Sequence, residues 1–165
     1  MAKSTSSIQL MLHALDEAYG AGAWHGTSLR GSLRGVSARA ASWRPGRGRN
    51  SIRDLVLHAA YWKYRVRQRL TSEKRGTFAI PGKNFFKLSD PTEKVWRSER
   101  QLLDREHRAL RSTVAAFPEA RLRKPLSGSR RRTPLREIAG IALHDVYHTG
   151  QIQMLKVLYR QRRKR

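Results

Sequence analysis

The spacing of apolar residues constrains this chain more than any other feature of its sequence. Long stretches carry apolar side chains three or four positions apart, which is the period of a helix with one face in a core. No stretch shows the apolar–polar alternation that is typical of a half-buried strand. The 165 residues are enough for one domain with a substantial core. The sequence therefore predicts a single all-α domain over residues 1–165, built as an up-down-type four-helix bundle.

Start and stop signals divide the chain into helices and connections. Ser51 and Asp54 have the spacing of a capping box, and Thr133-Pro134 is typical of a helix start. The four long helices are expected over roughly residues 6–19, 51–71, 92–117 and 134–159, and a basic tail over about 160–165. An extra short helical segment is expected around 29–36. A long aromatic loop at 76–91 carries Phe85 and Phe86, which can either line a pocket or anchor the loop to the bundle.

Composition excludes several classes of protein. The chain has no cysteine, which rules out disulfide scaffolds, thiolate metal sites and a thiol nucleophile, so a metal site must use histidine and carboxylate. A net charge of +23 is typical of proteins that meet polyanions. The basic residues are spread along the chain, however, and no nucleic-acid-binding motif is recognisable, so nucleic acid is not the favoured partner. No apolar run is long enough for a membrane span or a signal peptide, and we expect a cytoplasmic protein.

Three histidines are expected to point into the bundle. His144 and His148 lie four residues apart in the last helix, where their imidazoles can share one metal ion. His58 shares the apolar face of the second helix with Leu55 and Trp62. An uncompensated buried histidine is costly, and a metal held between facing helices accounts for all three. The alternative is that the histidines fill polar gaps in the core.

The residue after His144 invites comparison with zincin proteases, whose helix reads H-E-x-x-H. In those enzymes a glutamate acts as general base, whereas here the shorter Asp145 occupies that place. No histidine or acidic residue follows His148 to complete a zincin ligand set. The sequence therefore argues against a protease.

Two segments carry a resemblance to a known family: the run from His58 to Trp62 and the run from His144 to Ile152. With support from Trp43-Arg44-Pro45 and the loop at 76–91, the chain resembles the DinB/YfiT-like superfamily of bacterial four-helix-bundle metalloenzymes. The resemblance implies a divalent metal, usually zinc or nickel, held by His58, His144 and His148 with open positions for water or substrate. Some members are transferases that use a low-molecular-weight thiol, and relatives are often homodimers.

Four further residues are candidates for roles beside the metal. Asp54, Asp145 and Gln151 are candidates for orienting the imidazoles, and His25, in a Trp-His-Gly segment, for contacting substrate. Plainer interpretations remain open: Asp54 as the capping-box acid, Asp145 as a solvent-facing residue, His25 as part of a structural corner. The two remaining histidines, expected on helix surfaces, are His13 and His107.

The sequence thus predicts a divalent-metal-dependent enzyme with a three-histidine site that acts on a small molecule. The expected chemistry is thiol-dependent transfer or a hydrolase-type reaction. The alternative is a non-enzymatic basic helical protein that binds nucleic acid or another polyanion, and steep salt dependence would distinguish it. A third interpretation keeps the metal as a structural element without turnover.

Overall fold

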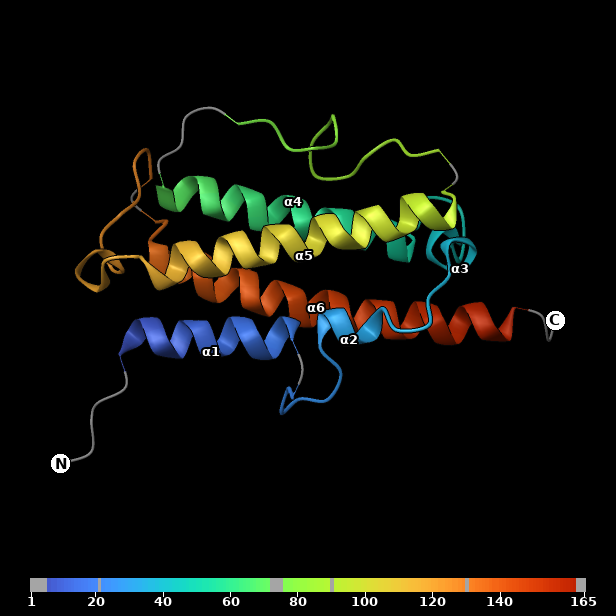
Figure 1. Ribbon diagram of the computed structural model, residues 1–165, viewed down its shortest axis with the longest axis horizontal. Helices are drawn as coiled ribbons and strands as arrows, with labels where there is room; N and C mark the ends of the chain where they lie inside the picture. The colour runs from blue at the N-terminus through green and yellow to red at the C-terminus, as the bar shows by residue number, and fades with distance from the viewer. Residues whose placement is uncertain (1–5, 21, 72–75, 90, 130, 163–165) are drawn as a thin grey trace.

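Four long helices form the body of the molecule. The computed structural model describes residues 6–20, 22–71, 76–89, 91–129 and 131–162, and these residues contain helices, turns and one isolated β-bridge, Lys83 to Phe85. The long helices are α1 (Ser7–Tyr19), α4 (Ile52–Thr71), α5 (Glu93–Ala115) and α6 (Pro134–Gln161) (Figure 1). The connections hold α2 (Leu29–Ser32), α3 (Ala38–Ser42) and a 3-10 turn, η1 (Glu119–Arg121). The predicted all-α class and the four long helices are confirmed.

Side-chain caps fix where the helices begin. The Ser51 amide donates to the Asp54 carboxylate at 2.7 Å, and the Asp54 amide donates to the Ser51 hydroxyl at 3.2 Å, which is the predicted capping box. Thr92 and Thr133 accept the amide N–H three residues further on, at the starts of α5 and α6. The short helical segment expected around 29–36 is α2, capped by Ser28, and a second short helix that the sequence did not predict, α3, follows it with Ser37 as its cap.

The long helices pack in a fixed order, and the path of one connection sets the direction of α5. Around the bundle the order is α4, α5, α1, α6, and α1 and α6 run opposite to α4 and α5 (Figure 1). Segment 76–89 returns along α4, because its residues Gly76, Asn84 and Ser89 contact in turn Tyr64, His58 and Arg53. α5 therefore starts beside the start of α4 and runs parallel to it. In chain order the four long helices therefore run up, down, down and up (Figure 1).

A polar layer divides the apolar core into two clusters. One cluster includes the first half of α4 and the end of α6, and the other includes the end of α4 and the start of α6. Between them Lys63 and Asp145, both fully buried, form an ion pair that joins α4 to α6. The interpretation of Asp145 as solvent-facing is therefore wrong. The expected surface position of His107 is also wrong: it is 6% exposed and stacks on Tyr19.

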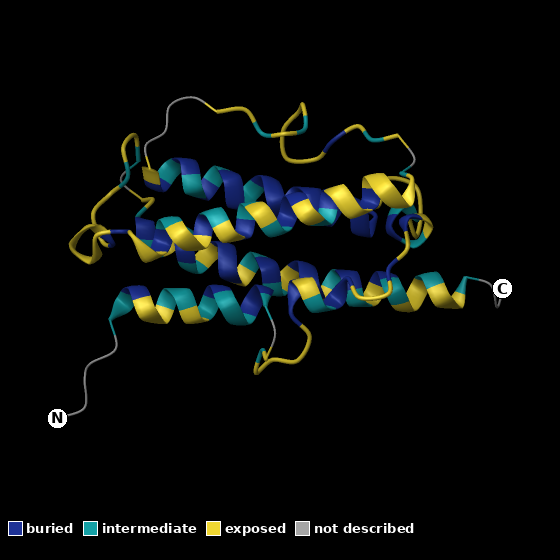
Figure 2. Cartoon of the chain, viewed as in Figure 1, coloured by how far each residue is buried: buried dark blue, intermediate teal, exposed yellow. Residues whose placement is uncertain are grey.

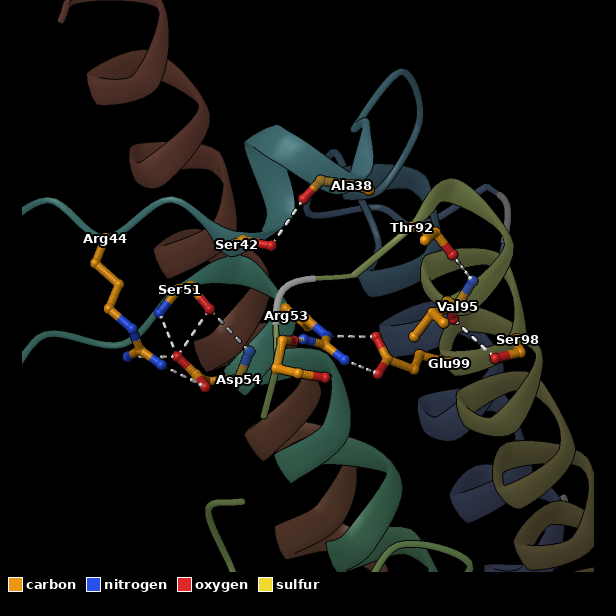
Figure 3. A network of polar contacts seen from close by, with 11 residues as sticks. Ala38, Ser42, Arg44, Ser51, Arg53, Asp54, Thr92, Val95, Ser98 and Glu99 are labelled. Atoms are coloured by element: carbon orange, nitrogen blue, oxygen red, sulfur yellow. Dashed lines mark hydrogen bonds and ion pairs between the residues drawn. The ribbon is translucent and has the colours of Figure 1, made fainter. Parts of the chain in front are cut away.

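Exposed residues lie on the outer faces of the long helices, and buried residues line their inner faces (Figure 2). Arg53 of α4 donates two hydrogen bonds to Glu99 of α5, so a buried ion pair joins the first turn of α4 to the second turn of α5, which runs parallel to it (Figure 3). Within the described residues no helix is both long and apolar enough to cross a membrane.

Candidate metal centre

Three imidazole rings meet on the seam between α4 and α6. His58 comes from α4, and His144 and His148 lie one turn apart on α6. The Nε2 atom of His144 lies 3.0 Å from Nε2 of His58 and 3.0 Å from Nε2 of His148. Candidate ligand atoms of the three residues all lie within 4.8 Å of one another. The structure thus brings together the three histidines that the sequence singled out.

Hydrogen bonds on the far side of two rings fix the direction of their lone pairs. His58 Nδ1 lies 3.1 Å from the backbone carbonyl of Asn84, and His148 Nδ1 lies 2.6 Å from the side-chain oxygen of Gln151. Both oxygens can only accept, so each Nδ1 carries the proton and each neutral ring presents an Nε2 lone pair to the centre. Outer hydrogen bonds of this kind orient histidine ligands in metal sites.

Burial keeps the three rings neutral. It lowers the pKa of His58, and lowers that of His144 to about 3 and that of His148 to about 4. The neighbouring histidines of the centre lower the pKa of His144 and His148 further, because each would repel a second positive charge. Neutral imidazole is the form that binds a metal ion.

These residues fit a divalent cation. The lone pairs of His58 and His148 both face His144 Nε2, which can supply one proton at most and would leave one lone pair unsatisfied. One cation accepts all three. Around a tetrahedral zinc ion with Zn–N distances of about 2.0–2.1 Å, ligand nitrogens lie about 3.3 Å apart, close to the 3.0 Å that separates His144 Nε2 from Nε2 of His58 and from Nε2 of His148.

Segment 76–89 covers one side of the centre. Asn84 has a φ of 64°, a conformation that asparagine tolerates better than most residues, and it aims its carbonyl at His58. Its side-chain oxygen accepts a hydrogen bond from the Trp62 indole at 2.9 Å. Next to it, Phe85 stacks on the His58 ring with centroids 4.5 Å apart and planes inclined by 10°. The loop therefore both orients and shields His58.

A cavity of about 220 Å³ opens on another side of the centre, next to His144. Trp62 and Ile141 supply apolar walls, and Arg69 and Arg136 supply positive charge. Glu137 pairs with Arg69 at 2.6 Å. Arg136 has no carboxylate partner among the described residues. The cavity can admit a small molecule to the exposed edge of the centre.

The other candidate residues have different surroundings. Gln151 does contact a ring of the centre, as described. The Asp54 carboxylate accepts hydrogen bonds from Ser51 and pairs with Arg44 at 2.7 Å, in a network at the start of α4 (Figure 3). Asp145 pairs with Lys63 in the polar layer. His25 is exposed and belongs to the connection between α1 and α2. In Figure 1 this connection and segment 76–89 lie on opposite edges of the bundle.

Comparison with known proteins decides the family. The sequence model of the DinB superfamily matches residues 22–152, which include all three histidines. The chain belongs to the DinB superfamily. No curated protein and no solved structure matches it. The family resemblance inferred from the His58 and His144 segments is therefore confirmed, and the DinB match covers α4 and the part of α6 that carries His144 and His148.

Asn84 contacts a histidine of the centre in this DinB protein, and the sequence did not single it out. It acts through its backbone carbonyl, and its only signal in the sequence is an asparagine within a long loop, a residue type enriched in left-handed conformations. The sequence suggested Phe85 as a pocket wall or a loop anchor, and the structure stacks it on a histidine of the centre.

Proposed function

We propose that the chain is a divalent-metal-dependent enzyme that holds zinc or nickel through the Nε2 atoms of His58, His144 and His148 and acts on a small molecule. The observation that carries the proposal is the convergence of three neutral imidazoles, two of which have donated their Nδ1–H groups elsewhere. Such a set presents lone pairs that only a cation satisfies together.

A divalent ion on three imidazoles supplies Lewis acidity, which lowers the pKa of a water molecule or a thiol. The chain has no cysteine, so a thiol nucleophile has to come from a low-molecular-weight cosubstrate. Transfer to or from such a thiol is the first reaction class to test, and hydrolysis is the second.

The protein's own residues position the reactants. Asn84 and Gln151 hold the rings of His58 and His148 in one orientation. Phe85 covers His58 and excludes water from that side. The cavity beside His144 leaves that part of the centre open, and Arg136 on its wall favours a substrate or cosubstrate with a negative charge.

The test is an activity screen on protein reloaded with zinc or with nickel. Thiol-transfer and ester-hydrolysis substrates are assayed with the parent, with His148→Ala, and with the matched control His13→Ala, which removes an exposed histidine on α1. We expect turnover in the parent and the control and its loss in His148→Ala. Equal turnover in His148→Ala would contradict the proposal. Metal retained without turnover of any substrate would favour a structural metal.

A further inference from the structure

A second cavity lies away from the metal centre. It has a volume of about 540 Å³ and opens where α1 ends, between α2 and α5. The helix order around the bundle places the α1–α5 seam opposite the α4–α6 seam that carries the histidines. Four arginines line it: Arg30, Arg34, Arg97 and Arg100. The positive charges come from two segments far apart in the sequence, so the fold gathers them at one place.

The cavity contains one carboxylate for these four guanidinium groups. Asp104 accepts a hydrogen bond from the Tyr19 hydroxyl at 2.5 Å and lies 3.9 Å from Arg30. Among the described residues, no carboxylate lies within ion-pair distance of Arg34, Arg97 or Arg100. The positive charge of these three arginines is therefore available to bind an anion from solution.

The rest of the described chain offers no spare acid to neutralise this cavity. Each acidic side chain there already lies beside a hydrogen-bond donor or a basic group, as Asp16 does beside Arg111, Glu99 beside Arg53, and Glu17, 3.7 Å away, beside His13. The guanidinium of Arg100 packs over the Trp96 ring, 5.6 Å from its centroid, and its buried Nε has no hydrogen-bond partner. The Arg100 side chain is thus already positioned in the ligand-free cavity, with a free hydrogen-bond donor.

The chemistry of the lining indicates the class of ligand. Every cation is an arginine, whose planar fork matches the oxygens of a phosphate in a bidentate way. The volume lies in the range of small-molecule sites, about 300–1,000 Å³, and exceeds what one phosphate group needs. Leu33, Gly31 and Tyr19 add apolar and aromatic surface for an organic part. We propose that this cavity binds a phosphorylated small molecule that carries at least two negative charges.

This proposal does not rest on the metal centre. Isothermal titration calorimetry at 0.15 M salt, with ADP as the probe, tests it on the whole protein, and inorganic phosphate and citrate are the comparison ligands. We expect ADP to bind more tightly than either comparison ligand. Replacement of Arg34 and Arg97 together, as Arg34→Gln/Arg97→Gln, should weaken ADP binding at least about tenfold, because charge-assisted hydrogen bonds are lost. Both side chains are exposed, so the bundle should fold normally.

The control variant is Arg105→Gln/Arg108→Gln, which removes the same charge from exposed positions of α5 outside the cavity. We expect it, and His144→Ala, to bind ADP within about twofold of the parent. An equal loss in the two arginine variants would overturn the proposal in favour of diffuse attraction. Loss in His144→Ala would place the ADP at the metal centre instead. Citrate that binds as tightly as ADP, or a single-stranded oligonucleotide that displaces ADP from the cavity, would also overturn it.

Discussion

His107 should make the stability of the protein depend on pH in a way that one substitution removes. Its ring is 6% exposed and stacks on Tyr19 with centroids 3.8 Å apart. Burial, helped by the nearby Lys63 ammonium, lowers its pKa from 6.5 to about 3. Between these pH values the unfolded chain binds a proton that the folded protein does not bind. The free energy of unfolding therefore falls as the pH falls below 6.5.

The size of the effect follows from the two pKa values. At pH 5 His107 is protonated in the unfolded chain and neutral in the folded protein. This difference lowers the free energy of unfolding by 1.36 kcal/mol for each pH unit below 6.5, or about 2 kcal/mol in all. A folded-state pKa anywhere below 4 gives nearly the same result. His107→Phe removes the titrating group and keeps an aromatic ring against Tyr19.

Urea denaturation of metal-free protein at pH 8 and pH 5 measures this effect. Between pH 8 and pH 5 the free energy of unfolding should fall by about 2 kcal/mol more in the parent than in His107→Phe. The contributions of the other buried histidines are the same in both proteins and cancel in this difference. His13→Gln, which removes an exposed histidine, should follow the parent. Equal losses in the parent and His107→Phe would refute the reasoning.

Three further predictions concern other contacts. Lys63→Met should lower the free energy of unfolding, measured by urea denaturation, by about 3–5 kcal/mol, because it leaves Asp145 buried and unpaired. Lys63→Met/Asp145→Leu should recover most of that loss, and no recovery would contradict the paired role. Gln151→Leu should weaken zinc binding about 10–100-fold in competition with a chelator while the ligands stay in place, and unchanged affinity would argue against the orienting hydrogen bond. Trp24→Ser should change stability by less than about 0.5 kcal/mol, since Trp24 is 92% exposed, and a larger loss would indicate a contact the structure lacks.

The helices could be predicted from the sequence because their signals are local. The Ser51–Asp54 capping box and the Thr133 cap act within three residues, and both are present as predicted. The grouping of the histidines was also accessible, because the i, i+4 spacing on one helix and the apolar neighbours of His58 indicated a shared inward face.

The features that the sequence did not reveal depend on distant partners. Lys63 is the kind of residue normally found at a surface, and its burial requires Asp145, which lies on another helix. His107 lies between charged residues in the sequence, and its burial depends on packing against other helices, including the ring of Tyr19. The direction of α5 depends on segment 76–89 running back along α4, and loop length alone does not specify that path.

The central claim is that the three histidines hold one divalent ion, and metal analysis tests it most directly. Tag-free protein is reloaded with zinc or nickel, desalted, and its metal content measured by mass spectrometry, beside His58→Ala, His144→Ala/His148→Ala and the control His13→Ala. We expect near-stoichiometric metal in the parent and in the control, and loss of the metal from both variants of the centre. A parent that stays empty after reloading, or variants that keep the parent's metal content, would contradict it.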